Sequence, residues 1–241
     1  MNERRILHRG TYVHAIRSAN GGPLSISGIA APFNTYAELK GYREIIQPGA
    51  FRSALRQATQ GKQDPVCLFN HDPNMLLGRF SNRMLSAEEI SSGLSFTCQL
   101  PNTSVARDLH ALIENRSVTG CSFGFACNPN VDDVWDEGMA DGLGLDSEDS
   151  EDEDGRSRRS KSGRVSFVRR TIKNFSLLSD LGPVTFPAYS SGTSVHSMEG
   201  RSMPVIPESC PMEFRSRILE VRGHQDDVRS RRKNLLGVVL G

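Results

Sequence analysis

The feature that most constrains the fold of this chain is a block of charge at residues 132–164, DDVWDEGMADGLGLDSEDSEDEDGRSRRSKSGR. A dense acidic run is followed at once by a basic run, and apolar side chains are few. Such a segment cannot bury enough apolar surface to offset the entropy that a chain loses when it becomes ordered. The block therefore predicts a disordered, solvated loop, and the folded core must come from the segments on either side of it.

The chain before this block is expected to form short strands and two helices. Apolar side chains alternate, or run together between turn signals, in the segments expected as strands. These are two segments within residues 11–32 around the turn sequence NGGP, and residues 65–71, 93–100 and 117–126. Helices are expected from about residue 50 and over residues 103–115, where Thr103 or Ser104 can cap the N-terminus.

Periodicity also predicts which side chains these elements bury. In residues 93–100 one face of the strand carries Leu94, Phe96, Cys98 and Leu100. The helix near residue 50 should bury Phe51, Ala54, Leu55 and Ala58, and the second helix should bury Val105, Leu109, Leu112 and Ile113. Each element therefore presents one apolar face to a common core.

After the charged block, residues 164–189 are expected to be β-rich, and the chain from residue 190 is rich in Ser, Gly and Pro. A basic amphipathic helix is expected around residues 213–222. This predicts an N-terminal segment with a first strand (1–22), one domain (23–189) interrupted by the block, and a flexible linker and tail (190–241). The fold class is α+β, with a mainly antiparallel sheet or β-barrel flanked by helices.

Composition excludes several functions. The formal net charge of the 241 residues is +1, so no overall field favours nucleic acid or a membrane surface as a partner. No apolar stretch approaches the roughly 18–20 residues that span a bilayer, and the N-terminus lacks the apolar core of a secretory signal, so an intracellular location is expected. The five cysteines form no C-x-x-C pair, and no second His/Asp pair accompanies His71-Asp72. Reduced thiols, no metal and no cofactor are expected.

Three residues could form a hydrolytic site. A serine nucleophile needs a neutral imidazole as base, a partner that orients the imidazole, and main-chain N–H groups aimed at the developing oxyanion. Ser122 lies between Gly120 and Gly124, His71 ends an apolar run, and Asp180 is an available orienting carboxylate. Each is also typical of an ordinary turn, and His71-Asp72 could be a surface Asx-turn. Spacing alone cannot bring the three together.

Five segments together carry a more specific signal: REIIQPGAF, VCLFNHDPNMLLGRF, GLSFTCQLPNT, LIENRSVTGCSFGF and LSDLGPVTFPAY. In order and spacing they resemble the HK97-type prohead protease family of tailed phages, over roughly residues 23–189. The resemblance implies a serine endopeptidase with the fold of the herpesvirus maturational proteases, a β-barrel ringed by helices. It also implies that the enzyme acts inside an assembling capsid, in the cytoplasm of the bacterial host.

The resemblance implies roles for particular residues. The histidine of the family's NHD motif falls on His71, its serine on Ser122 and its acidic residue on Asp180. The family's valine-serine after that acidic residue is replaced here by Leu181-Gly182, which makes the third role less secure. For the oxyanion and the substrate, the candidates are Gly120, Phe123, Gly124, Arg169 and Arg170.

The resemblance further implies partners. The expected substrate is the scaffold, or the scaffold-like arm of the major capsid protein, and the enzyme is expected to cleave itself as well. A homodimer or a higher oligomer is compatible with the sequence, as is an origin in a phage or a prophage. The charged block and the tail are open to roles in docking, targeting or self-cleavage.

Three alternatives remain open. The chain could be a non-catalytic capsid assembly or scaffold-binding protein. The pattern Gly-x-Ser-x-Gly also fits the nucleophile elbow of α/β-hydrolases, which would make an esterase of Ser122, Asp180 and His196. Finally, Cys121 could replace its neighbour as nucleophile. Adjacent strand residues face opposite sides of a sheet, so only one of the two can face His71, and the resemblance selects Ser122.

Overall fold

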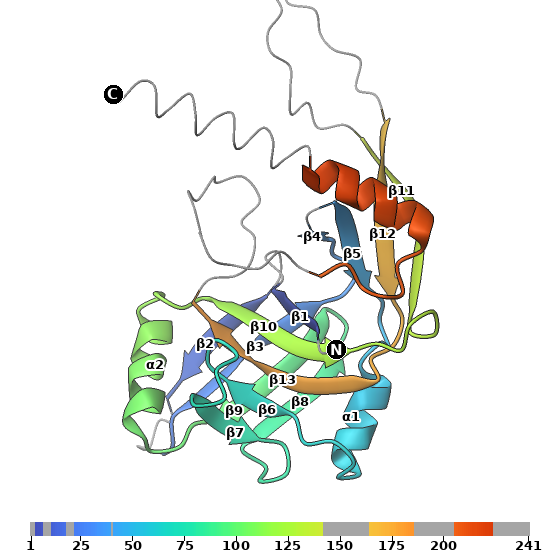
Figure 1. Ribbon diagram of the computed structural model, residues 1–241. Coiled ribbons are helices and arrows are strands. Elements are labelled where there is room, and N and C mark those ends of the chain that lie inside the picture. The colour runs from blue at the N-terminus through green and yellow to red at the C-terminus, as the bar shows by residue number, and fades with distance from the viewer. Residues whose placement is uncertain are drawn as a thin grey trace, which may run out of the picture.

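The computed structural model describes residues 3–6, 11–17, 22–39, 41–141, 164–185 and 205–223. Short strands dominate them, and three helices accompany the strands (Figure 1). The strands are β1 (Glu3–Ile6), β2 (Tyr12–Ile16), β3 (Ser25–Pro32), β4 (Ala37–Leu39), β5 (Tyr42–Ile46), β6 (Val66–Leu68), β7 (Leu76–Arg79), β8 (Leu85–Ile90), β9 (Gly93–Gln99), β10 (Gly120–Ala126), β11 (Asp133–Asp141), β12 (Arg164–Ile172) and β13 (Leu177–Val184). The helices are α1 (Arg52–Thr59), α2 (Ser104–Glu114) and an unlabelled C-terminal helix over residues 212–223.

The strands form three sheets. The site sheet has the order β1-β10-β13-β6-β7, the cover sheet β2-β3-β9-β8, and the hairpin sheet β11-β12-β5-β4. Pairing is antiparallel except between β13 and β6 and between β12 and β5. The α+β class with mainly antiparallel sheets is therefore confirmed.

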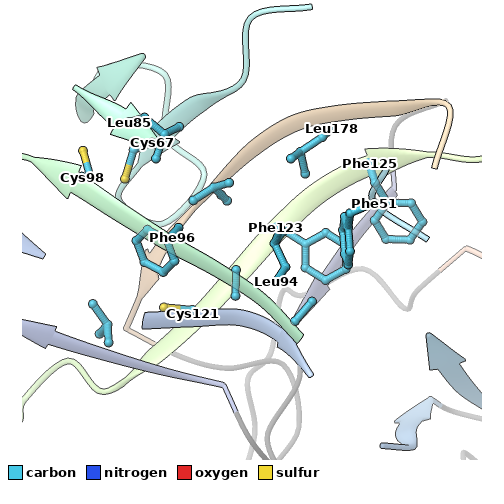
Figure 2. Close-up of a cluster of buried hydrophobic side chains, with 14 of the residues drawn as sticks. Phe51, Cys67, Leu85, Leu94, Phe96, Cys98, Cys121, Phe123, Phe125 and Leu178 are labelled. Carbon is cyan, nitrogen blue, oxygen red and sulfur yellow. The ribbon is translucent and has the colours of Figure 1, made fainter. Parts of the chain in front are cut away.

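The main core lies between the site sheet and the cover sheet. The alternation expected in residues 93–100 is confirmed, because all four predicted side chains are buried and join this core. Phe123 and Phe125 on β10 meet Phe51 and Phe175 in an aromatic cluster, with ring centroids 4.3–5.8 Å apart where they touch. Aromatic packing of this kind fixes the position of β10. Figure 2 shows Phe51, Phe123 and Phe125 of this cluster.

The expected barrel is wrong, because the described strands do not close into one. The edge of β10 that would have to pair with the cover sheet pairs instead with β1, over residues 122–125. The cover sheet joins only just before this point, where the Val13 N–H donates to the Thr119 carbonyl at 3.3 Å. The two sheets therefore pack face to face without a continuous ladder.

Both predicted helices of the main domain are present. In α1, Ala54 and Ala58 are buried, and the preceding Phe51 is wholly inaccessible to solvent. The N-cap of α2 is Thr103, whose hydroxyl oxygen accepts from the Ala106 N–H at 3.3 Å. The buried stripe of α2 differs from the prediction and contains Ala106, Leu109, His110 and Ile113, while Val105 and Leu112 are partly exposed. Hydrophobicity alone misplaced this stripe, because His110 is held inside by a hydrogen bond between Nε2 and the Ile16 carbonyl at 3.2 Å.

The charged block is partly ordered, which corrects the prediction of a solvated loop from residue 132. Its first residues form β11, which pairs along its whole length with β12. Two side chains of β11 explain why this part of the block is ordered. Trp135 packs against a second apolar cluster, and its neighbour Asp136 forms an ion pair with Arg169 of β12. The remainder of the block, residues 142–163, lies outside the described residues.

The C-terminal region also departs from the prediction of a linker and tail. Residues 205–223 pack against the hairpin sheet, with the amphipathic helix running from 212 to 223. The cluster that joins them contains Leu39, Tyr42, Val168, Ile206, Cys210 and Ile218. An apolar face on β11, β12 and β5 is therefore covered by a segment that comes later in the chain than all three strands.

Candidate active site

Ser122 projects from the face of β10 that lies away from the main core. Its neighbours Cys121 and Phe123 belong to the core, so the alternation of a strand turns Ser122 to the other face. Ser122 is itself inaccessible to solvent. On its two sides in the sheet it is paired with Ile6 of β1 and Gly182 of β13. The candidate nucleophile is thus held on an interior strand rather than on a mobile loop.

The same alternation separates Ser122 from the rival nucleophile Cys121. The Cys121 thiol faces the core, where Sγ lies 3.4 Å from the Tyr12 carbonyl oxygen. Burial raises the pKa of this thiol well above its ordinary value, so the reactive thiolate is disfavoured. A hydrogen bond with the Cys98 thiol, together with burial, likewise raises the pKa of Cys67 in the same core (Figure 2). These cysteines are packing residues.

His71 is presented by a tight turn that follows β6. Asn70 and His71 both have positive φ, 56° and 57°, and the Asp72 N–H donates to the Phe69 carbonyl at 3.1 Å. Positive φ at both central residues is the geometry of a type I′ turn, in which glycine normally follows asparagine. A histidine at this position costs on the order of 1 kcal/mol of backbone strain. Strain of this kind is typical of residues whose side chains are held for a function.

Asn70 fastens this turn to the end of β13. Its N–H donates to the Pro183 carbonyl at 3.0 Å, and its side-chain Oδ1 accepts from the Thr185 N–H at 2.8 Å. Its Nδ2 also donates to Thr185 Oγ1 at 3.0 Å. Asp72 does form the expected Asx-turn, since its Oδ1 accepts from the Asn74 N–H at 2.8 Å. Loop and strand are therefore clamped together beside the site.

The structure brings the three predicted residues into one chain of hydrogen bonds. His71 Nε2 lies 2.6 Å from Ser122 Oγ, and His71 Nδ1 lies 2.9 Å from Asp180 Oδ2 and 3.2 Å from Oδ1. A carboxylate only accepts hydrogen bonds, so Nδ1 carries the hydrogen and Nε2 is left to accept from the serine hydroxyl. The side chains of His71 and Asp180 are only 11% and 5% exposed, so water screens this contact little.

The carboxylate of Asp180 occupies the space that a side chain on Gly124 would fill. The two residues are paired across β10 and β13, and a Cβ added to Gly124 would lie 2.6 Å from Asp180 Oδ2. The second glycine of Gly-x-Ser-x-Gly therefore leaves room for the carboxylate of Asp180. Glycine is required for a similar reason at position 182, opposite Ser122. A Cβ added to Gly182 would lie 2.2 Å from the Leu68 carbonyl oxygen.

The predicted oxyanion residues Gly120, Phe123 and Gly124 all lie on β10, the strand that carries Ser122. Phe123 and Gly124 lie where β10 is paired on both sides, so their main-chain N–H groups point along the sheet toward β1 or β13. The Phe123 ring is buried in the aromatic cluster. Gly120 starts the strand, opposite Val184 and outside the stretch that pairs with β1.

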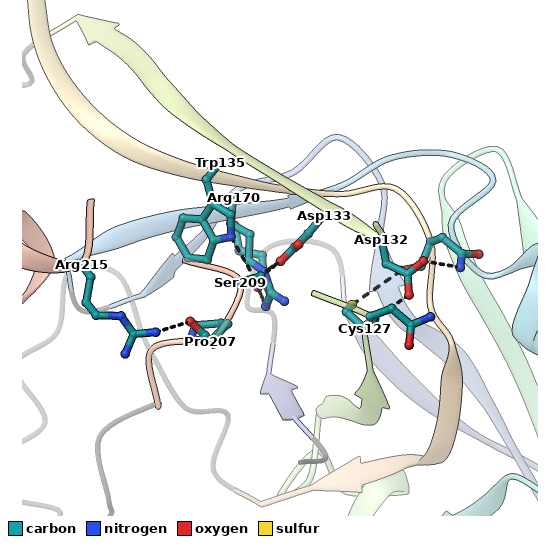
Figure 3. A network of polar contacts seen from close by, with 11 residues as sticks. Cys127, Asp132, Asp133, Trp135, Arg170, Pro207, Ser209 and Arg215 are labelled. Atoms are coloured by element: carbon teal, nitrogen blue, oxygen red, sulfur yellow. Dashed lines mark hydrogen bonds and ion pairs between the residues drawn. The ribbon is translucent and has the colours of Figure 1, made fainter. Parts of the chain in front are cut away.

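The role predicted for Arg169 and Arg170 at the oxyanion is not supported by the structure. Strand β12 carries both residues into the hairpin sheet, where each forms ion pairs with carboxylates. Arg170 is 1% exposed and donates to Asp133 Oδ2 at 2.7 Å (Figure 3). It also donates to Glu44 Oε2 at 2.9 Å. Arg169 pairs with Asp136 through two hydrogen bonds of 2.7 and 2.6 Å. A buried guanidinium with two carboxylate partners has a structural role here, not one at an oxyanion.

The esterase alternative lacks its structural context. A nucleophile elbow places the serine on a sharp turn between a strand and a helix. Ser122 instead lies within β10, and the next element along the chain is strand β11. The other predicted member of that triad, His196, lies outside the described residues.

Two absences hold for the part of the chain that the structure describes. Among them, no group of three or more His, Cys, Asp or Glu side chains is arranged to hold a metal ion. Within the same ranges, no helix is long and apolar enough to cross a membrane.

Sequence reasoning missed Asn70, Thr185 and the role of Gly124. A signal for Asn70 exists, because asparagine is one of the non-glycine residues that most often adopt positive φ. Nothing local marks Thr185, and the Gly-x-Ser-x-Gly pattern that marks Gly124 does not reveal its contact with Asp180. Their roles arise from contacts between segments more than fifty residues apart.

The geometry defines the class of the site: a serine, a histidine and an aspartate joined in the order that serine hydrolases use. Comparison with family models places the chain more closely. The model described as "Caudovirus prohead serine protease" matches residues 12–204, and the chain belongs to that family. The resemblance found in the sequence is therefore confirmed. No curated protein and no solved structure matches the chain.

Proposed function

We propose that this protein is a serine endopeptidase of prohead maturation in which Ser122 is the nucleophile, His71 the general base and acid, and Asp180 the group that orients the imidazole. The family supports a capsid-maturation protease in general. The single observation that carries the assignment of residues is the 2.6 Å contact between His71 Nε2 and Ser122 Oγ, with Asp180 on the opposite ring nitrogen.

The geometry supports acyl transfer. Ser122 Oγ attacks the carbonyl carbon of the scissile peptide bond while its proton passes to His71 Nε2. The tetrahedral intermediate then collapses, Nε2 returns the proton to the leaving amine, and an acyl-enzyme ester remains. Water attacks the ester as Nε2 takes its proton. The second tetrahedral intermediate then collapses, the bond between Oγ and the acyl carbon breaks, and Nε2 returns the proton to Ser122 Oγ as the new carboxyl terminus leaves. Asp180 stabilises the imidazolium in both halves, at a contact that is largely dry.

The substrate we propose is the scaffold or the scaffold-like arm of the major capsid protein, cleaved inside the assembling prohead in the host cytoplasm. Cleavage of the chain itself is part of the same proposal. Both follow from the family rather than from any contact in the structure.

Co-expression of the full chain with the major capsid protein of the same phage tests this function. Mass spectrometry of new termini should find specific fragments with the wild type and none with Ser122→Ala or His71→Ala, because loss of either group costs on the order of 10⁶ in turnover. Two matched variants serve as controls and should cleave normally: Ser86→Ala, an exposed serine on β8, and Cys121→Ala. Normal cleavage by Ser122→Ala would contradict the assignment, and a wild type without fragments would favour a non-catalytic assembly protein.

A further inference from the structure

The first strand of the chain lies directly against the candidate nucleophile. β1 runs antiparallel to β10 with Ile6 opposite Ser122, Arg5 opposite Phe123, Arg4 opposite Gly124 and Glu3 opposite Phe125. Residues opposite each other in an antiparallel pair have Cα atoms about 4.5–5.5 Å apart. Any extended chain in the place of β1 therefore passes its backbone within reach of Ser122.

That place is the only in-plane approach to Ser122 that the site sheet offers among its described strands. On its other side β10 pairs with β13, and β13 is itself paired with β6. A polypeptide cannot add to β10 from that side without breaking the sheet. On the β1 side, the described strand that would have to be displaced is four residues long.

β1 can leave this edge without unfolding its neighbour in the sequence. β2 begins at Tyr12, after five intervening residues, and is paired along its length with β3 in the cover sheet. Its Val13 N–H also holds the Thr119 carbonyl just before β10. The anchor of the N-terminal segment is thus β2, while β1 is a short strand tethered beside Ser122.

We propose that the edge of β10 now paired with β1 is the seat of the polypeptide substrate, which binds as an added antiparallel strand, and that β1 is an internal occupant that must leave first. The inference rests on the proposed function and specifies the class of substrate: an extended segment recognised largely through its main chain. The complete burial of Ser122 agrees with an occupied site. Adding a strand positions the scissile carbonyl by the register of the ladder.

The tether makes β1 an effective competitor. A strand joined by a short linker competes at an effective concentration in the millimolar range, so it can hold the edge with few contacts. When the open form is a fraction f of the molecules, the apparent dissociation constant of an added strand rises by 1/f. Weakening β1 should therefore tighten the binding of a strand supplied from outside.

The test weakens β1 in the full chain without removing it. In a Ser122→Ala background, Arg4→Pro/Arg5→Pro is compared with Arg4→Ala/Arg5→Ala. Adjacent strand residues direct their N–H groups to opposite sides, so one of the two prolines removes an N–H that faces β10. The alanine variant loses the same two charges but keeps both N–H groups. Proline is tolerated on edge strands, and circular dichroism checks that both variants are folded.

The probe is a fluorescently labelled peptide with the sequence of residues 1–8, MNERRILH, followed by anisotropy. The proline variant should bind it at least about tenfold more tightly than the alanine variant, and hydrogen exchange should show protection of residues 122–125 by the peptide. Equal binding, or protection elsewhere, would overturn the inference. This readout needs no turnover, so Ser122-dependent fragments decide the proposed function separately from this result.

Discussion

Gly124 and Asp180 face each other across β10 and β13, and the carboxylate of one lies where the side chain of the other would be. A Cβ on Gly124 would lie 2.6 Å from Asp180 Oδ2, 2.7 Å from Oδ1 and 2.6 Å from Ser179 Oγ. No rotation of a flexible chain end relieves this contact, since Asp180 is nearly buried and bound to His71. The orientation of the imidazole thus depends on the absence of one methyl group.

Gly124→Ala should therefore impair the site more than the fold. The displaced carboxylate can no longer hold His71 Nδ1, and misplacement by about 1 Å costs on the order of 100-fold in turnover. Overpacking should lower the free energy of unfolding by about 1–3 kcal/mol. The measurements are the cleavage rate and urea unfolding. Gly223→Ala, where an added Cβ meets nothing within 4 Å, is the matched control and should leave both unchanged.

The fold was predicted best where the sequence pattern is local. The strand at residues 93–100, the helix capped by Thr103 and the α+β class follow from periodicity and capping, and the structure confirms them. The start of strand β11 around Trp135 could not be predicted locally, because the partners of Trp135, Tyr42 and Ser209, come from distant segments. Charge density described the block as a whole and concealed one amphipathic strand within it.

The candidate site, unlike the fold, could not be predicted from local sequence patterns. Residue types alone left His71, Ser122 and Asp180 as three unrelated turn or strand residues, and only the family resemblance joined them. The structure now shows their contacts, but it removes Arg169 and Arg170, whose carboxylate partners Asp136, Asp133 and Glu44 no sequence pattern identifies. Long-range pairing, rather than local propensity, decides such assignments.

The clamp between Asn70 and Thr185 predicts a positioning role for Asn70. Asn70→Ala removes both side-chain hydrogen bonds to Thr185, so the strained turn should relax and carry His71 away from Ser122. We expect kcat to fall roughly 10–100-fold with little change in KM, since the imidazole rather than the substrate seat is disturbed. Steady-state kinetics measure this.

Two controls accompany this variant. Asn74→Ala, in the same turn but bound to Asp72, should retain kcat to within about twofold. The double variant Asn70→Ala/Thr185→Ala should lose less kcat than the product of the two single-variant losses. Both substitutions remove the same hydrogen bond, from Asn70 Nδ2 to Thr185 Oγ1. Fully multiplicative losses, or an effect confined to KM, would argue against the clamp.

Asp64 predicts a particular pH dependence of stability. Burial alone would raise the pKa of this carboxyl, but hydrogen bonds from Arg79 and from the N–H and hydroxyl of Ser81 outweigh it and hold the pKa below its usual value. Because the pKa of Asp64 is lower in the folded state than in the unfolded state, its carboxylate stabilises the fold. This stabilisation is fully present above the pKa of the unfolded state, near pH 4, and is lost as the pH falls through the pKa of the folded state.

Asp64→Asn should therefore be less stable than the wild type by on the order of 1 kcal/mol at pH 6–7. The difference should shrink below about pH 4, where the wild type also loses its carboxylate. Urea unfolding at pH 7, 5 and 3 measures it. Asp108→Asn, an exposed position on α2, should show a small effect at each pH. A difference for Asp64→Asn that grew as the pH fell would refute this account.

Ile218 tests whether residues 205–223 are part of the folded unit. Its side chain is inaccessible to solvent in the cluster with Tyr42 and Val168, against which Trp135 also packs. Ile218→Ala should cost about 2–4 kcal/mol by leaving a cavity, whereas Leu219→Ala, at a position 54% exposed, should cost little. Trp135 is the chain's one tryptophan, so its fluorescence reports on the surroundings of this cluster. In urea, its emission should shift to the red at clearly lower concentration for Ile218→Ala than for Leu219→Ala. Identical transitions for the two variants would mean that the segment behaves in solution as the flexible tail that its composition suggests.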